Sequence, residues 1–148
     1  QALHQNWGNA YIAFMANLIR VFIIDDHEEV RRALVARLRS SPEIEIVGDS
    51  GSAEDGLEKT KTLQPDVLLI ETKRADGRGI EIVDAINQSG LKTQVIVLTS
   101  YTSEWERLTM YHSGAARYLL KDIDSAQLID EIRTVVKQGS ESAVQPNQ

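Results

Sequence analysis

Hydrophobic residues along the chain follow two alternating patterns. Short apolar runs that are rich in β-branched residues predict buried strands at residues 19–25, 44–49, 67–71, 95–99 and 117–120. Each run precedes a stretch in which apolar residues recur at helical spacing. Five strand–helix units in a row predict an α/β domain in which helices cover both faces of a parallel sheet, because parallel strands are joined by right-handed crossovers.

Capping residues and turns mark the ends of the predicted helices. The helices are expected at about residues 28–40, 53–63, 79–87, 104–112 and 125–136. Ser52 and Asp55 have the spacing of a capping box, and Ser103 can cap the fourth helix. Gly139 is expected to close the last helix, since glycine is favoured just past a helix end.

Length and composition indicate one domain with short flanking segments. The chain has 148 residues, of which 42% are hydrophobic, so it can bury a core of its own. We expect residues 15–139 to form the domain and residues 140–148 to be a C-terminal tail or the start of a linker. Residues 1–14 are expected to be either a leader, upstream of or added to the natural start, or a short extra helix.

Charge and cysteine content narrow the classes of partner. No apolar run reaches the ~20 residues of a membrane span. The net charge of −6 argues against nucleic-acid binding by this domain itself, because phosphate contacts need clustered Lys and Arg. The chain has no cysteine, which excludes disulfides and thiolate metal sites and suits a reducing, cytoplasmic compartment.

Polar side chains follow the predicted strands. Asp25 and Asp26 come after the first strand, Glu71 ends the third, Thr99 the fourth, and Lys121 follows the fifth. In such sheets ligands bind at the carboxyl ends of the strands, so these groups should converge. Carboxylates suit Mg²⁺, while a lysine and a hydroxyl can contact a phosphoryl group. Each residue alone has a plainer role, such as helix capping or a surface position, and only their convergence indicates a site.

Five stretches carry a family resemblance: I-R-V-F-I-I-D-D-H-E, I-E-I-V-G-D-S, Q-P-D-V-L-L-I, V-I-V-L-T-S-Y and S-G-A-A-R-Y-L-L-K-D. Residues 18–139 thereby resemble the receiver domain of bacterial two-component response regulators, and most of all the branch that precedes a helix-turn-helix output domain. The resemblance implies a flavodoxin-like (CheY-like) (βα)₅ three-layer sandwich with sheet order 2-1-3-4-5. It also implies a non-enzymatic signalling module, a protein partner such as a histidine kinase, and control of transcription through a separate output domain.

The same resemblance implies roles for individual residues. The metal ligands would be Asp25, Asp26, Glu71 and the backbone carbonyl of Lys73, with Mg²⁺ held weakly or not at all. The phosphoryl pocket and its switch would be formed by the Thr99 hydroxyl, the Lys121 ammonium and the ring of Tyr118.

The phosphoacceptor position departs from the family pattern. Family members have aspartate where this chain has Glu71, and the usual Met-Pro pair is replaced by Arg74-Ala75. Glutamate moves the carboxylate by roughly one 1.5 Å bond, and a misplacement of about 1 Å can cost ~10²-fold in rate. We therefore expect a phosphorylation-independent receiver in which Glu71 is either a partial phosphomimetic or the mark of a degenerate site. Phosphorylation of Glu71 or of a neighbour such as Asp76 is the alternative.

Two polar or aromatic surfaces are candidates for partner contacts, besides an apolar stripe on the last helix. The first helix of the domain carries four arginines that form either a solvated face or a docking surface: Arg31, Arg32, Arg37 and Arg39. Trp105 and Tyr111 place aromatic residues on the face through which this family usually signals, although Tyr111 could equally be core.

The last predicted helix carries a possible second apolar stripe. Ile129, Ile132 and Val136 are expected to face the core. Leu128 and Val135 are seven residues apart and are expected to lie off that core face, where they could support a homodimer.

Two enzymatic or cofactor-binding alternatives fit the sequence less well. A Mg²⁺-dependent phosphohydrolase with Asp25 as nucleophile needs a second acid two residues on, where this chain has His27, which we interpret as a helix-start residue. Flavin or nucleotide binding is disfavoured because the acidic first loop, D-D-H-E-E, would repel a phosphate.

Overall fold

The computed structural model describes residues 2–72 and 77–144, with side chains for residues 7–72 and 77–141. Its helices and strands, in chain order, are α1 (Ala2–Ala16), β1 (Ile19–Ile24), α2 (Glu28–Arg39), β2 (Ile44–Ser50), α3 (Ala53–Leu63), β3 (Val67–Ile70), α4 (Gly79–Gln88), β4 (Gln94–Thr99), α5 (Glu104–His112), β5 (Arg117–Leu120) and α6 (Ser125–Val144). No helix in this part of the chain is both long and apolar enough to cross a bilayer.

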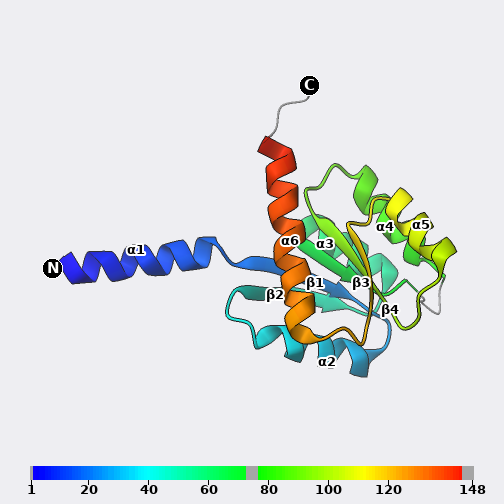
Figure 1. Cartoon of the computed structure of the whole chain (residues 1–148), viewed down its shortest axis with the longest axis horizontal. Coiled ribbons are helices and arrows are strands. Elements are labelled where there is room, and N and C mark those ends of the chain that lie inside the picture. The colour runs from blue at the N-terminus through cyan, green and yellow to red at the C-terminus, as the bar shows by residue number, and fades with distance from the viewer. Residues whose placement is uncertain (1, 73–76, 145–148) are drawn as a thin grey trace.

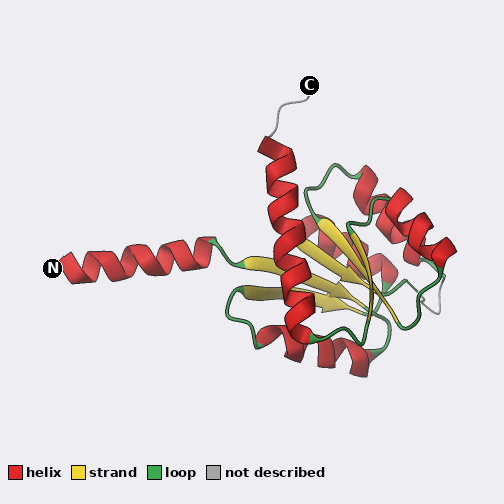
Figure 2. Cartoon of the chain, viewed as in Figure 1, coloured by secondary structure: helices red, strands yellow, loops and turns green. Residues whose placement is uncertain are grey.

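The five strands form one parallel sheet in the order β2-β1-β3-β4-β5. Helices α2 and α6 pack on one face of it, and α3, α4 and α5 pack on the other. Figures 1 and 2 show the sheet between these two helical layers. The predicted three-layer sandwich and its strand order are therefore confirmed.

Alternate residues of each strand supply the two halves of the core. Along β1, Val21 and Ile23 point toward α2 and α6, whereas Phe22 and Ile24 point toward α3 and α4. All four are at most 1% exposed. Burial on both faces explains why the strands appear in the sequence as nearly continuous apolar runs.

The predicted helix caps are confirmed at two positions. The Ser52 hydroxyl accepts a hydrogen bond from the Asp55 backbone N–H at 3.2 Å, and the Ser103 hydroxyl accepts one from Glu106 at 3.4 Å. The Asp55 carboxylate accepts from the Ser50 hydroxyl at 2.8 Å and so ties the start of α3 to the end of β2.

The last helix differs from the prediction at its C-terminal end. We expected Gly139 to close it, but α6 continues to Val144. Gly139 lies against β4 within the helix, where a Cβ would come within 2.7 Å of the Gln94 side-chain nitrogen. The glycine thus accommodates a close approach to the sheet and does not terminate the helix.

The predicted second stripe on the same helix is wrong. Leu128 and Val135 are 0% and 1% exposed and belong to the core with Ile132. The partly buried Ile129 and Val136 pack at its margin. The apolar residues of this helix cover a wide arc of its surface, at positions 128, 129, 132, 135 and 136. The sequence alone therefore does not determine which part of that arc faces the sheet. Neither Leu128 nor Val135 can therefore contact a second copy.

Residues Ala2–Ala16 form a helix, as one of the two expectations for the N-terminal segment proposed. Figure 1 shows α1 projecting from the rest of the fold, at the end where the strands begin. A two-residue link, Asn17 and Leu18, joins it to β1, whose first hydrogen bond runs from Ile19 to the Glu43 carbonyl.

Candidate functional site

Three charged side chains meet at the carboxyl ends of the central strands. Asp25, Glu71 and Lys121 directly follow β1, β3 and β5. The backbone N–H of each residue donates a hydrogen bond to a backbone carbonyl of the neighbouring strand. Asp25 donates to the Ser50 carbonyl at 3.0 Å, Glu71 to the Ile24 carbonyl at 3.1 Å, and Lys121 to the Thr99 carbonyl at 2.8 Å. The sheet ladder therefore fixes where each side chain emerges, which confirms the convergence expected at this edge.

One ammonium group bridges two buried carboxylates. The Lys121 Nζ lies 2.6 Å from Asp25 Oδ2 and 3.0 Å from Glu71 Oε2. Both acidic residues are only 2% exposed. Burial alone would lower the pKa of Lys121, but its hydrogen bonds to Asp25 and Glu71 outweigh that effect and raise the pKa. Lys121 is therefore charged and balances one of the two negative charges.

Metal-binding groups converge beside this bridge. Within the described residues, the one cluster of ligand-type side chains is Asp25, Asp26 and His27, whose ligand atoms lie within 4.8 Å of one another. The His27 backbone donates to Asp25 Oδ1 at 2.9 Å, and its Nδ1 lies 3.2 Å from Asp26 Oδ1. Two carboxylates fit Mg²⁺, which commonly uses one or two and keeps several waters. Among the predicted ligands, Glu71 turns to Lys121, and Lys73 lies outside the described residues, as do Arg74, Ala75 and Asp76.

The predicted switch residues lie together next to the site. Tyr118 is 7% exposed, and its hydroxyl donates to Glu106 Oε1 at 2.7 Å and accepts from the Ser103 N–H at 3.2 Å. Burial and the Glu106 contact raise the pKa of Tyr118 to about 12. Thr99 is fully buried and donates to the Tyr101 carbonyl at 3.0 Å. The aromatic ring is thus held inward against the start of α5.

A match to a family model decides what this arrangement is. The model of the response regulator receiver domain matches residues 21–133, which contain all the site residues above. The chain belongs to the response regulator receiver domain family.

Relatives of this receiver include transcription regulators. It is 35% identical over 118 residues to the DNA-binding transcriptional activator DevR/DosR of Mycobacterium tuberculosis, an alignment that covers 80% of this chain and 54% of that protein. It is 36% identical over 120 residues to the transcriptional regulatory protein LiaR of Bacillus subtilis, covering 81% and 57%. The receiver thus spans little more than half the length of these relatives.

Solved structures agree on the fold. The signal receiver domain of a NarL response regulator from Mycobacterium tuberculosis superposes with a TM-score of 0.77 at 26% identity, over 82% of this chain and 98% of that one. A CheY-like receiver domain protein from Methanospirillum hungatei superposes with a TM-score of 0.74 at 21% identity, over 84% and 98%, which shows the fold alone.

The sequence did not single out Glu106 as a site residue. Its carboxylate accepts from both Tyr118 and the Thr72 hydroxyl, the latter at 3.4 Å, so it links the residue after Glu71 to α5 and β5. Ser103 and Glu106 have capping-box spacing, which was a usable signal for a residue at the start of α5. In a capping box the Glu106 carboxylate would accept the hydrogen bond of the Ser103 N–H. In the structure the Tyr118 hydroxyl accepts it, which the spacing could not reveal.

Arg31 and Arg32 differ in what they contact. The Arg31 guanidinium donates to the Asp25 backbone carbonyl at 2.6 Å and to Asp49 Oδ1 at 2.7 Å, and its side chain is 16% exposed. Arg32 is 78% exposed and pairs with Glu28 at 2.7 Å. Arg31 therefore braces the acidic loop from within the receiver, whereas Arg32 remains an exposed docking candidate.

Arg37, which was also expected on a solvated or docking face, is a second internal brace. Its guanidinium donates to the Ile123 carbonyl at 2.5 Å, to the Ser125 hydroxyl at 2.9 Å and to the Lys121 carbonyl at 3.4 Å. These bonds tie α2 to the loop that carries Lys121. The position of the bridging lysine thus depends on α2 as well as on β5.

The aromatic residues predicted for a signalling face lie on the outer side of α5. Trp105 is 70% exposed and Tyr111 is 39% exposed, with Leu108 between them at 56%. The Arg107 guanidinium lies over the Tyr111 ring, 5.8 Å from its centre. This face begins at Trp105, the residue directly before Glu106, which contacts the switch tyrosine.

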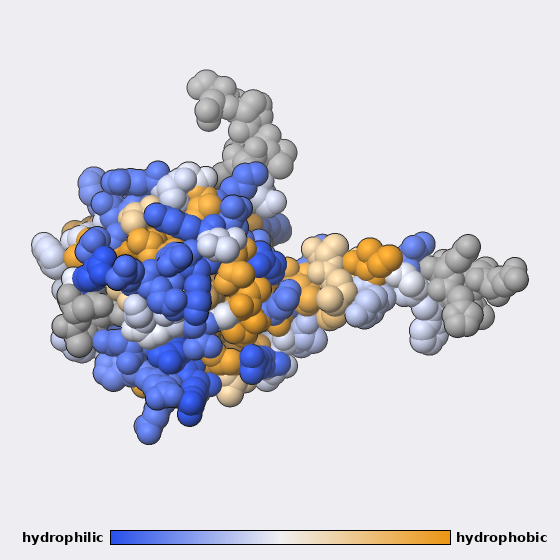
Figure 3. All heavy atoms as spheres, turned by 180° about the vertical axis from the view of Figure 1, so that it is seen from behind, coloured by the Kyte–Doolittle hydropathy of each residue, from blue (hydrophilic) through white to orange (hydrophobic). Residues whose placement is uncertain are grey.

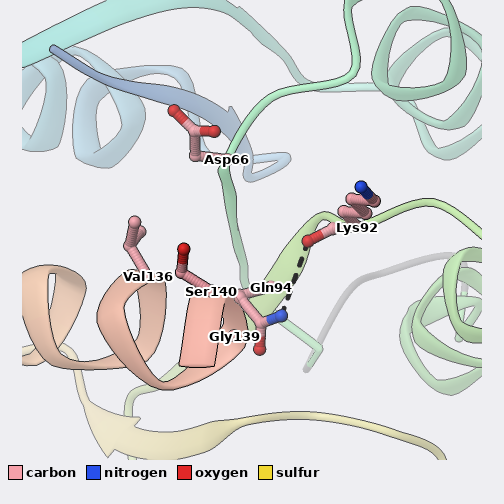
Figure 4. A pocket seen from close by; sticks show the side chains of 6 residues that line it. All are labelled: Asp66, Lys92, Gln94, Val136, Gly139 and Ser140. Carbon is pink, nitrogen blue, oxygen red and sulfur yellow. Dashed lines mark hydrogen bonds between the residues drawn. The ribbon is translucent and has the colours of Figure 1, made fainter. Parts of the chain in front are cut away.

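A cavity of about 290 Å³ lies at the opposite end of the sheet (Figure 4). It is lined by Asp66, Lys92, Gln94, Val136, Gly139 and Ser140. Asp66 and Gln94 stand where β3 and β4 begin, so the cavity is separate from the carboxylate site, which lies where the strands end.

Proposed function

We propose that this receiver signals without being phosphorylated and that Glu71 replaces the phosphoacceptor aspartate. The observation that carries the proposal is the ion pair between the buried Glu71 carboxylate and Lys121, at 3.0 Å. By the family resemblance, Lys121 is the residue that contacts the phosphoryl group. In this chain its ammonium is already paired with the longer carboxylate at the phosphoacceptor position.

Charge at the site makes phosphoryl transfer dependent on a metal ion. Asp25 and Glu71 share one ammonium, and Asp26 lies beside them, so the pocket keeps a net negative charge. An incoming phosphoryl donor is itself anionic and would be repelled unless a metal ion compensated. A Mg²⁺ ion held by Asp25 and Asp26 would supply that charge neutralisation when bound.

The state of Tyr118 favours a phosphomimetic site over a merely degenerate one. The ring is inward and hydrogen-bonded to Glu106, which also contacts Thr72, the residue next to Glu71. A chain of contacts thus runs from the acidic position to the aromatic face of α5. Since one carboxylate carries less charge and fewer oxygens than a phosphoryl group, we infer a partial shift toward the active form.

The relatives support a role in transcription. Two of them are described as a transcriptional activator and a transcriptional regulatory protein, and neither description names an enzymatic activity. We infer that this receiver controls transcription through an output domain, in the same protein or in a partner, and that it contacts its partners as a protein-binding module.

Intact mass spectrometry tests the proposal. The chain is incubated with Mg²⁺ and acetyl phosphate, alongside Glu71→Asp and Glu71→Gln variants. We expect the natural sequence and the glutamine variant to keep their mass, because neither has a carboxylate at the phosphoacceptor distance. A stable gain of one phosphoryl group by the natural sequence would overturn the proposal, and peptide mapping would show whether Glu71 or Asp76 carries it.

A further inference from the structure

One side of α1, whose side chains are exposed throughout residues 7–16, carries an apolar stripe. Trp7, Tyr11, Phe14 and Met15 follow the spacing i, i+4, i+7, i+8, which places them on one face of the helix, and Ile12 lies at the edge of that face. These five side chains are between 47% and 75% exposed. Figure 3 shows apolar surface running along this helix and on to the adjoining part of the receiver. We call these five residues the α1 stripe.

The helix that carries the stripe needs a partner surface. It is 15 residues long, and isolated helices of that length are marginal in water. Gly8 within it costs roughly another 1 kcal/mol of helix propensity. Three large aromatic residues exposed on one face of a helix are also an unfavourable surface for a monomer in water.

We propose that the α1 stripe binds the same stripe of a second copy of this chain. Helix α1 contains no Asp, Glu, Lys or Arg. Two such helices can therefore meet without burying a charge, although each chain carries a net charge of −6. The lack of basic residues disfavours an anionic lipid surface as the occupant.

The area of the stripe is sufficient for a dimer. An aromatic side chain can bury about 150–250 Å², so the five partly exposed residues offer about 500 Å² in each copy. Two copies would together bury about 1,000 Å², the lower limit of a specific interface. An isologous pair with twofold symmetry uses the same patch on both copies, as a self-complementary aromatic stripe allows.

This dimer leaves the receiver site accessible. Helix α1 enters β1 at Ile19, whereas Asp25 follows the other end of that strand, about 20 Å away at the usual rise per residue. The α5 face with Trp105 also stays free for another partner. The proposal is thus independent of whether Glu71 is phosphorylated.

Sedimentation velocity of the full chain tests the proposal. We expect the natural sequence to sediment at twice the monomer mass of 16.5 kDa in the micromolar range. Trp7→Lys combined with Phe14→Lys should raise the dissociation constant at least about 100-fold, because it removes two central anchors. The matched control is Asn9→Lys with Ala13→Lys, which adds the same charges to the opposite side of α1 and should leave the dimer intact.

A second measurement uses the fact that the chain has two tryptophans, Trp7 and Trp105. In a Trp105→Phe variant, Trp7 fluorescence should shift to shorter wavelength as the protein concentration rises through the dissociation constant. The proposal is overturned if the natural sequence stays monomeric. Binding of this monomer to neutral vesicles would then show that the α1 stripe contacts a lipid surface and not a second copy. The proposal is equally overturned if the stripe variant remains dimeric, or if Trp105→Lys dissociates the dimer and the stripe variant does not.

Discussion

At the residue scale, the main feature is a carboxylate that is one methylene longer than the family pattern. The sequence predicted that Glu71 and Lys121 would meet, because both follow strands of one parallel sheet. It did not predict that Lys121 would divide its ammonium between Glu71 and Asp25, at 3.0 and 2.6 Å. That division depends on side-chain torsions, which no spacing along the chain encodes.

Removing Lys121 should be the most damaging change at the site. Lys121→Met leaves two buried carboxylates without their shared cation, and breaking such a pair typically costs about 3–5 kcal/mol. Urea unfolding measures this. A double variant that adds Glu71→Gln should recover part of the loss, since only one buried charge then remains. Equal stability of the single variant and the natural sequence would show that the bridge does not exist in solution.

Tyr118 should titrate later in the folded protein than in the unfolded chain. Its pKa is raised to about 12 by burial and by its bond to Glu106. Because the folded-state pKa lies above the unfolded value of about 10, this group's stabilisation is complete below pH ~10 and is lost as pH rises toward 12. Phenolate absorbance, compared with a Tyr118→Phe variant, should assign the late step to Tyr118. A midpoint for this residue near 10 would mean that the ring is not held inward.

At the scale of elements, the sequence predicted all five strands and the helices of the sandwich because both faces of the sheet are buried. It failed on α6. Several adjacent apolar positions left the helix phase open, so Leu128 and Val135 were assigned outward although they are core. Gly139 was interpreted as a stop signal, but glycine is also used where a helix approaches a strand closely.

Arg37 should hold the loop between β5 and α6. Arg37→Met removes donors to Lys121, Ile123 and Ser125, and we expect a loss of about 1–3 kcal/mol. Amide hydrogen exchange should become faster in residues 121–125. The control is Arg39→Met, an exposed position on the same helix, which should stay within about 0.5 kcal/mol of the natural sequence. Unchanged exchange in the Arg37 variant would contradict the bracing role.

At the scale of the whole molecule, the two ends of the sheet carry different features. The carboxyl ends carry the acidic site, and the amino end of β1 carries α1. The predicted topology located the acidic site, but the sequence left a helix as one of two options for residues 1–14. Alanine, glycine and asparagine around the α1 stripe weaken the contrast between its faces, so the helical period is hard to recognise.

Shortening the chain should separate these two features. A chain that begins at Asn17 keeps every strand and the whole acidic site. We expect its unfolding free energy to be independent of protein concentration, whereas that of the full chain should rise with concentration if α1 pairs two copies. Parallel urea titrations at several concentrations measure both. A concentration dependence that persists in the shortened chain would place the interface elsewhere.

We propose that Glu71 shifts this receiver part of the way toward its active form without phosphorylation. Amide NMR spectra of the natural sequence, recorded with Mg²⁺ before and after addition of acetyl phosphate, test it most directly, with Glu71→Gln as the reference for loss of the charge. We predict that acetyl phosphate leaves the signals of residues 99–112 and 118 unchanged, while Glu71→Gln shifts them. The proposal would be contradicted if acetyl phosphate shifted these signals. It would also be contradicted if the glutamine variant and the natural sequence gave the same signals.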